Sequence, residues 1–371
     1  MIPPSLTYAA SGVDTAAGDR AVELMADRVR GTHRLGPGAV MAGGGGFAGM
    51  VDVSFLTRMR RPVLATSTDG VGTKLAVAQA MDIHDTVGID LVAMVVDDLV
   101  ACGAQPLFLT DYLVVDRVLP QRVADIVGGV ARGCHLARCP LVAGETAEHP
   151  GLLGDGAYDL AGAATGVLDA DDALGPARVG VGDVAVGIAA SGLHSNGFSL
   201  ARTIVEAAGW RWERRIDEFG RTLGEELLEP TAIYAGTVLD LMQAVPGAVH
   251  AVSHVTGGGI AANLARVLPL GSHLDVDRAT WSPGAVYTVL GDAGGVAHDE
   301  RERTWNQGVG MMLIVATERA AEVVDTLATT GFAAWPCGEV STVAAVPTGA
   351  VSGTKGVSGG SARLVGAHPH P

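Results

Sequence analysis

Aromatic residues are scarce in this sequence: they make up 4% of its 371 residues, whereas hydrophobic residues of all kinds make up 48%. A core with so few rings must be built mainly from Val, Ala, Leu and Ile, a composition that favours a soluble α/β protein over a disordered chain. At this length we expect two domains rather than one.

Basic residues and paired cysteines are also few. The chain has 25 Lys and Arg against 40 Asp and Glu, a formal net charge of −15. A nucleic-acid surface needs clustered Lys and Arg to neutralise phosphates, so we expect no nucleic-acid partner. The four Cys form no CxxC pair and no Cys/His group at zinc spacing, which favours reduced thiols in the cytoplasm.

The sequence has no long apolar run free of charges. Its most apolar segment, residues 87–104, contains three Asp, and the first residues lack the basic start and apolar stretch of a signal peptide. We therefore expect a cytoplasmic protein with neither a signal peptide nor a membrane span.

Apolar runs and turn signals alternate in the pattern of an α/β protein. A stretch rich in Asp, Gly and Pro, residues 169–183, marks the boundary between an N-terminal domain (1–170) and a C-terminal domain (171–346). The tail, 347–371, is small, polar and Gly-rich, and we expect it to be mobile. The predicted strands are 62–68, 107–115, 140–146, 158–168, 184–192, 249–259 and 309–316, and the predicted helices are 123–137, 197–208 and 260–268.

No P-loop sequence GxxxxGK[ST] occurs, so a phosphate site must come from another Gly-rich segment. Residues 44–49 (GGGFAG) match GxGxxG without its strand-turn-helix context; Gly44, Gly45 and Gly46 suit a flap that closes over phosphates, or a plain flexible loop. Residues 257–262 (GGGIAA) lie between a strand and a helix, which would suit a dehydrogenase. Because too little chain follows for a complete dinucleotide domain, we expect an anion site there instead.

The stretch TSTDGVGTK (66–74) places a carboxylate, two glycines and a lysine in one turn after an apolar run. A nucleoside triphosphate needs a carboxylate for Mg²⁺, a cation for its phosphates and glycines for close backbone approach. The alternative is a Gly-rich turn with a surface ion pair. The residues concerned are Asp69, Gly70, Gly72, Thr73 and Lys74.

A helix follows, and its projection at 100° per residue separates its acidic residues. Asp98 falls within an apolar stripe, whereas Asp90 and Asp97 lie together on another face, where we expect them to be solvated. A carboxylate in an apolar stripe is costly unless it binds a metal or a partner. We therefore predict that Asp69 and Asp98 share Mg²⁺.

Three further segments carry candidate catalytic residues. Glu145 stands at a strand end in AGETAEHPG, where ligands commonly bind in α/β folds, although it could also be a turn carboxylate. His194 and Asn196 share the loop ASGLHSNGFSL, and His254 precedes TGGG. A lone His is more often structural than catalytic, but a loop with hydroxyl, amide, imidazole and glycines suits a phosphate or an amide.

Seven motifs occur in an order that resembles the phosphoribosylformylglycinamidine cyclo-ligase (aminoimidazole ribonucleotide synthetase) family. The resemblance implies a two-domain α/β (α+β) fold, a homodimer with paired N-terminal sheets, and ATP bound across the interface. It also implies ATP-dependent closure of formylglycinamidine ribonucleotide to aminoimidazole ribonucleotide in de novo purine biosynthesis. The motifs are SGVDTAAG (11–18), TSTDGVGTK (66–74), residues 84–112, AGETAEHPG (143–151), ASGLHSNGFSL (190–200), SHVTGGG (253–259) and WNQGVGM (305–311).

The resemblance also suggests roles for these residues. Asp69 and Asp98 would hold Mg²⁺, Lys74 the ATP phosphates, and the flap at 43–49 would close over ATP. His194, Asn196 and His254 would orient the substrate or stabilise the transferred phosphoryl group, with Glu145 a metal ligand or a proton acceptor. The family usually has Asn where Asp97 stands, which agrees with a solvated position for Asp97.

Related families are less consistent with the sequence. Selenophosphate synthetase would carry a reactive Cys or selenocysteine in its N-terminal loop, but no Cys precedes Cys102. A hydrogenase-maturation dehydratase would end in a Cys, whereas this chain ends GAHPHP. Thiamine-phosphate kinase remains a chemically similar alternative, and a nucleotide-binding dimer without activity is a second one.

Overall fold

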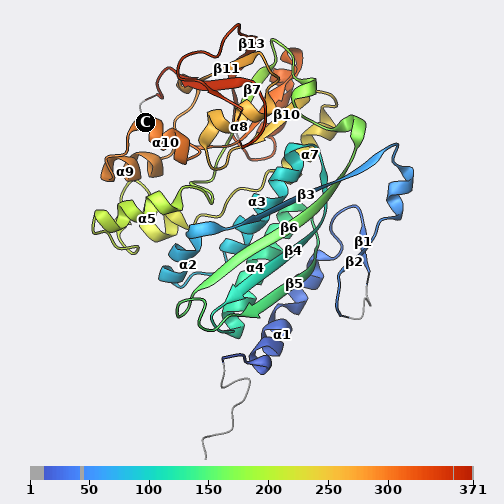
Figure 1. The fold of residues 1–371 in the computed structure, drawn as a ribbon, viewed down its shortest axis with the longest axis vertical. Coiled ribbons are helices and arrows are strands. Elements are labelled where there is room, and N and C mark those ends of the chain that lie inside the picture. Colours follow the sequence, from blue (N-terminus) through green and yellow to red (C-terminus); the bar gives the residue numbers. More distant parts are fainter. Residues whose placement is uncertain (1–11, 42–45, 354, 370–371) are drawn as a thin grey trace, which may run out of the picture.

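Two β-sheets lie one beyond the other along the long axis of the molecule (Figure 1). The structure is a computed structural model that describes residues 12–41, 46–353 and 355–369. One sheet has four strands and the other has seven, and each is flanked by helices. This mixed α/β architecture confirms the predicted fold class.

The four-stranded sheet is made from the first half of the chain, in the order β3-β6-β4-β5. β6 is antiparallel to both of its neighbours, and β4 and β5 are parallel. A two-stranded ribbon, β1 with β2, precedes it. The strands are β1 (Ala39–Met41), β2 (Met50–Asp52), β3 (Pro62–Gly70), β4 (Gln105–Val115), β5 (Leu141–Glu148) and β6 (Tyr158–Asp169), and the helices are α1 (Thr15–Thr32), α2 (Leu75–Met81), α3 (Val87–Ala101) and α4 (Pro120–Ala137).

The two faces of this sheet differ sharply in burial. Side chains that alternate along β4 and β6, such as Leu109, Leu113 and Leu160, are buried beneath the helices. On the opposite face Leu64 is 60% exposed and Tyr112 is 42% exposed. Within the part of the chain that the structure describes, the helices therefore cover one face and leave an apolar face open.

The seven-stranded sheet has the order β10-β12-β7-β13-β11-β15-β14. Its central strand pairs are antiparallel, and β15 joins β11 in parallel. A small ribbon, β8 with β9, lies apart from it. The strands are β7 (Val184–Ala189), β8 (Arg215–Ile216), β9 (Arg221–Thr222), β10 (Val249–His254), β11 (Ser272–Asp277), β12 (Val309–Val315), β13 (Ala334–Thr342), β14 (Val351–Ser352) and β15 (Ser361–Val365), and the helices are α5 (Phe198–Ala207), α6 (Leu223–Leu227), α7 (Ala235–Ala244), α8 (Gly259–Val267), α9 (Ala285–Ala293), α10 (His298–Thr304) and α11 (Ala320–Ala328).

Helix α3 joins the two halves of the molecule. It packs against β3, β6 and α4 on one side and against β10 and α7 on the other. Apart from Asp98, every residue from Val87 to Val100 is buried. A helix buried on nearly all sides is expected where two layers share it.

The C-terminal segment is part of the fold, so the prediction of a mobile tail over 347–371 was wrong for most of its length. Strand β15 pairs with β11 from His273↔Ser361 to Asp277↔Val365. The glycines suggested mobility, but Ser361 and Ala362 are buried and complete the sheet.

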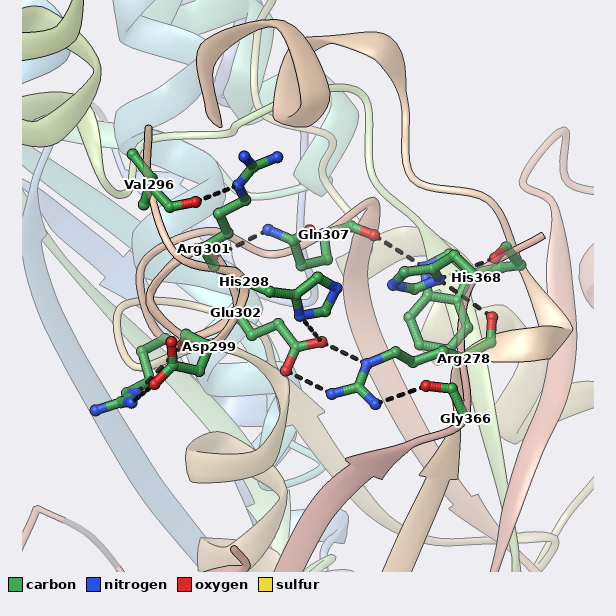
Figure 2. Close-up of polar contacts among 11 residues, drawn as sticks. Arg278, Val296, His298, Asp299, Arg301, Glu302, Gln307, Gly366 and His368 are labelled. Carbon is green, nitrogen blue, oxygen red and sulfur yellow. Dashed lines mark hydrogen bonds and ion pairs between the residues drawn. The ribbon is translucent and has the colours of Figure 1, made fainter. Parts of the chain in front are cut away.

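Beyond β15 the chain docks on the C-terminal domain (Figure 2). The Arg278 guanidinium donates to both carboxylate oxygens of Glu302, at 2.5 and 2.8 Å, and to the carbonyl oxygen of Gly366 at 3.1 Å. The His368 Nδ1 atom lies 3.1 Å from the carbonyl oxygens of Arg278 and Trp281, and its ring meets the Trp281 ring edge-on. These contacts fix the last described residues.

Each predicted element lies within a few residues of an observed one, with two kinds of omission. The sequence analysis gave no helix for α1, although Asp14 caps its start by accepting from the amide of Ala17. It also gave no helices for α2, α6, α7, α9, α10 or α11, and no strands for β1, β2, β8, β9, β11, β13, β14 or β15. In the described ranges, no helix is long and apolar enough to cross a membrane.

We predict that Ala362→Asp will destabilise the protein by about 3 kcal/mol, because it buries an unpaired carboxylate in β15, where Ala362 is fully buried. The matched control is Val346→Asp, directly before the tail at a side chain that is 53% exposed, with an expected effect within about 0.5 kcal/mol. Chemical denaturation measures both. Equal stabilities of the two variants would show that the tail does not contribute to the fold.

Candidate active site

The carboxylates of α3 lie in the opposite environments from those predicted. Asp90 and Asp97 are fully buried, whereas the Asp98 side chain is 50% exposed. The projection assumed that α3 has a solvent face, but the C-terminal domain covers that side of the helix. Asp97 accepts hydrogen bonds from the backbone N–H of Tyr234 at 3.0 and 3.2 Å, so it is not the solvated residue that we expected.

Asp69, Asp98 and His254 form an acidic cluster at the junction of the domains. His254 ends β10, and its Nδ1 lies 2.9 Å from the Asp98 Oδ1 atom. Burial alone would lower the pKa of His254, but this hydrogen bond and the nearby carboxylates raise it. Burial raises the pKa of Asp69, and the charge of Asp98 adds to the rise. The structure therefore places Asp69 and Asp98 close enough for their charges to interact, and their sharing of Mg²⁺ stays a prediction.

Asp98 itself keeps a low pKa. Burial works to raise it, but the hydrogen bond and charge of His254 outweigh that effect, and Arg266 and Lys355 add positive potential. Asp98 thus stays ionised at neutral pH, and its carboxylate favours the protonated form of His254.

His194 is a buried, neutral imidazole. Its Nε2 atom accepts from the backbone N–H of Ser191 at 3.2 Å, so the ring proton is on Nδ1. Burial lowers the pKa of His194 to about 3, and the positive charges of His254 and Lys74 contribute. The backbone of His194 has a left-handed φ of 62°, and Gly310 lies so close that a Cβ there would be 2.6 Å from the His194 ring.

Two buried ring nitrogens of this site, His194 Nδ1 and His254 Nε2, lack partners within the described residues. His194 Nδ1 carries the ring proton, and His254 Nε2 carries one in the protonated form that Asp98 favours. A buried donor without an acceptor costs free energy, so these nitrogens are candidates to bond ligand oxygens.

Asn196 has a structural contact beside this site. Its side-chain oxygen accepts from the backbone N–H of Gly257 at 3.0 Å, which joins the loop before α5 to the glycines that open α8. The predicted anion site at 257–259 therefore lies next to the histidine loop. A Cβ on Gly259 would meet the Glu302 carbonyl oxygen at 1.7 Å, so this turn needs glycine for packing as well.

Lys74 does not face the site. It is fully buried, and its Nζ donates to Asp90 Oδ1 at 2.8 Å and to the carbonyl oxygens of His194 and Glu229 at 3.2 and 2.6 Å. All three ammonium protons are therefore used within the protein, which contradicts the phosphate role that we expected. Asp90 also accepts from the N–H and hydroxyl of Thr231, at 2.8 and 2.6 Å.

Other predicted residues lie elsewhere. Glu145 is in β5, at the far edge of the sheet from β3. In the strand register it pairs with Tyr112, which pairs with Ala161, which pairs with Gly70 of β3. At ~4.8 Å between neighbouring strands, the backbone of Glu145 is about 14 Å from that of Gly70. Thr73 binds the Ser199 hydroxyl at 3.1 Å. Of the flap, Gly44 and Gly45 lie outside the described residues, and Gly46 is in the turn between β1 and β2.

Sequence reasoning missed Arg266 and Lys355, the two cations whose charge acts on Asp98. Lys355 belongs to the tail that we expected to be mobile, and Arg266 looks like an ordinary basic residue near a helix end. Among the described residues, no group of three or more His, Cys, Asp or Glu is placed to hold a metal ion.

We predict that Lys74→Met and Asp90→Asn will each lower the free energy of unfolding by about 3 kcal/mol or more, because each leaves the buried partner of the ion pair without its counter-charge. The double variant should cost less than the sum of the single losses, since it removes both charges together. A double-mutant cycle by urea denaturation measures the coupling. Additive losses would mean that the pair contributes no coupling to stability.

We predict that His194 stays neutral, with its proton on Nδ1, from pH 5 to pH 8. Its folded pKa lies below that of an unfolded His, so its stabilising contribution is complete above about pH 6.5 and is lost as the pH falls toward 3. Imidazole ¹⁵N shifts measured by NMR report the protonation state, and a His194→Gln sample assigns the signals. A titration midpoint near 6.5 would contradict this assignment.

Comparison with known proteins identifies the family. The model for "AIR synthase related protein, N-terminal domain" matches residues 51–168, and the model for the C-terminal domain of the same family matches residues 180–346. The chain also resembles solved structures in fold. Thiamine-monophosphate kinase from Stenotrophomonas maltophilia K279a matches with a TM-score of 0.63 and 16% identity over 93% of this chain and 97% of that one. HypE, a hydrogenase maturation protein from E. coli, matches with a TM-score of 0.64 and 17% identity over 95% of this chain and 93% of that one.

Curated relatives are much more similar in sequence. The chain is 44% identical over 335 residues to the phosphoribosylformylglycinamidine cyclo-ligase of Desulfitobacterium hafniense (strain DSM 10664 / DCB-2), with 90% of this chain and 96% of the relative covered. It is 45% and 46% identical over 337 residues to the proteins of that name from Carboxydothermus hydrogenoformans and Anaeromyxobacter sp. (strain Fw109-5), with coverage of 91% and 96%. The chain therefore belongs to the phosphoribosylformylglycinamidine cyclo-ligase family.

Proposed function

We propose that this protein converts formylglycinamidine ribonucleotide to aminoimidazole ribonucleotide in purine biosynthesis, with ATP giving ADP and phosphate. The observation that carries the proposal is the 44–46% identity to named cyclo-ligases over about nine-tenths of the chain. The proposed site lies around Asp69, Asp98, His194 and His254, where carboxylates and unpartnered N–H donors meet.

The chemistry needs activation of a poor leaving group. The formyl oxygen attacks the γ-phosphorus of ATP, the bond from that phosphorus to the bridging oxygen breaks, and ADP leaves. The amidine nitrogen then attacks the activated carbon, and the oxygen departs with the phosphate while the nitrogen loses a proton. Phosphoryl transfer of this kind depends on alignment and on stabilised charge rather than on covalent help from the protein.

The histidines suit the stabilising role. We assign His194 Nδ1–H and His254 Nε2–H as donors to oxygens of the transferred phosphoryl group or of the substrate. A neutral His194 does not lose its function by titration near pH 7, because burial holds its pKa far below that range. We assign Asn196 to positioning, since it ties the His194 loop to Gly257.

Asp69 and Asp98 provide the donor chemistry that Mg²⁺ prefers. Magnesium usually takes one or two carboxylates and completes its coordination with phosphate oxygens and water. Burial and, to a smaller extent, the negative charge of Asp98 raise the pKa of Asp69, and a cation between the two carboxylates would favour their ionised forms. We therefore propose them as Mg²⁺ ligands, a metal that would neutralise charge on the ATP phosphates.

ATP binding has two further supports. A solved structure of the hydrogenase maturation protein HypE in complex with ATP shares the fold (TM-score 0.58, 16% identity, 89% of this chain and 86% of that one). Arg266 and Lys355 bring positive charge toward Asp98, so we propose them in place of Lys74 as the cations near the phosphates. We keep Gly70, Gly72 and the 43–49 segment as backbone near ATP.

We further propose a cytoplasmic homodimer with no nucleic-acid partner. The open face of the four-stranded sheet carries exposed Leu64 and Tyr112, which a second copy would cover. Pairing of these faces would also bring β5 of one copy toward the candidate active site of the other. Glu145, which lies far from Asp69 within one chain, could then act in the site of the second copy.

The test is turnover by the purified chain with substrate labelled with ¹⁸O at the formyl position. If the formyl oxygen attacks the γ-phosphate, the label will appear in inorganic phosphate, and mass spectrometry of the phosphate measures it. Asp98→Asn should abolish turnover while retaining the melting temperature. Absence of turnover by the wild type would refute the proposed activity, and turnover with unlabelled phosphate would refute the phosphorylated intermediate.

A further inference from the structure

Asp111 is a buried carboxylate to which the proposed reaction gives no role. It lies in β4 on the face that the helices cover, and it is 8% exposed. Within the described residues, the only hydrogen-bond donor near its carboxylate is its own backbone amide. Burial raises the pKa of Asp111 to about 7. Buried carboxylates are usually paired, so a carboxylate without a partner requires an explanation.

The carboxylate faces a cavity beneath α1. The cavity has a volume of about 300 Å³, and the residues that line it include Ala21, Met25 and Val127 together with Glu145 and Thr146. Gly144 of the AGET motif makes room for the carboxylate, because a Cβ there would lie 2.1 Å from Asp111 Oδ1. The site thus combines the buried carboxylate of Asp111 with walls that are mostly apolar.

This chemistry selects the ligand. An ionised carboxylate in an apolar cavity favours a cation that can give two parallel N–H bonds to its two oxygens. Planar amidinium and guanidinium groups do this, and they are less strongly hydrated than an ammonium group, so they enter an apolar site at lower cost. A volume of about 300 Å³ also suits a small organic group better than a nucleotide.

We propose that Asp111 and the cavity beneath α1 form a binding site for a planar amidinium-type cation. The site is separate from the carboxylates of the candidate active site. Asp69 and Asp111 both pair with Gly162, from the strands on either side of it. At ~4.8 Å between neighbouring strands, their backbones are about 10 Å apart. The Leu91 side chain packs over Gly162, between the two carboxylates.

Two sources could supply this cation. One is the amidine of the ribonucleotide substrate, an identification that rests on the proposed function; the other is an independent small amidine or guanidine. Both sources present the same planar N–H donor group, so a small amidinium can be used as the probe. The binding experiment therefore needs neither ATP nor turnover. Its failure would therefore be distinguishable from failure of the proposed activity.

The probe is acetamidinium chloride, and neutral acetamide, which has the same shape, is the matched control. At pH 8 Asp111 is ionised, so acetamidinium should raise the melting temperature of the wild-type protein and acetamide should not. Two other titratable groups lie nearby: Glu145 also lines the cavity, and the Cys134 thiol of α4 faces Asp111. Burial raises the pKa of Cys134 well above its usual value, so this thiol stays neutral at pH 8.

Two variants test the assignment. Asp111→Asn should weaken acetamidinium binding by roughly thirtyfold or more, because it removes the buried charge. Gly144→Ala keeps the charge but displaces the carboxylate, and should also weaken binding. Asp69→Asn, which changes the other carboxylate of the row, should leave binding unchanged.

Competition distinguishes the two sources. If saturating ribonucleotide substrate abolishes the acetamidinium-dependent shift, the substrate's amidine is the occupant; if the shift persists, an independent cation is the occupant. Both results support a cation-binding site at Asp111 and differ only in the occupant. No response in the wild type, or equal responses in the wild type and Asp111→Asn, would overturn the proposal.

Discussion

The buried ion pair between Lys74 and Asp90 is the interaction on which the arrangement of the two domains depends. Lys74 follows the strand that carries Asp69, and Asp90 belongs to α3. Together they bind backbone groups of His194, Glu229 and Thr231, which all belong to the C-terminal domain. Desolvation of two charges is costly, so the pair is worth more as a geometric constraint than as a source of stability. It fixes the His194 loop against the end of β3.

Helix α3 shows how one element serves both packing and chemistry. Asp97 and Asp98 are neighbours in sequence but point into different surroundings. Burial raises the pKa of Asp97 to about 7, whereas Asp98, half exposed and bonded to His254, keeps a pKa below its usual value. Adjacent carboxylates with opposite shifts allow one to hold the backbone of Tyr234 and the other to carry charge in the site.

Much of the fold could be predicted from sequence, because period-2 apolar runs and turn residues mark strands such as β3 and β6. The site was only partly predictable. Asp69, Asp98 and His254 do meet, but the roles of Lys74, Asp90 and Asp97 depend on what covers α3, and a helix projection cannot detect a second domain packed on the polar face. Glycines in the tail suggested mobility, yet Gly359 packs so closely on the Ala265 carbonyl that a Cβ would lie 2.0 Å away.

The two lysines of the chain are placed in opposite environments, and this bears on how the phosphates are neutralised. Lys74 stands in the motif that suggests a phosphate ligand, but it is buried and fully bonded. Lys355 stands in the tail, beyond the region that the family models match, and its charge acts on both Asp69 and Asp98. A cation held in a docked C-terminal segment can approach a bound nucleotide without being buried, whereas a buried lysine would have to break three hydrogen bonds first. The tail is therefore better placed than the glycine-rich turn to supply positive charge to the site.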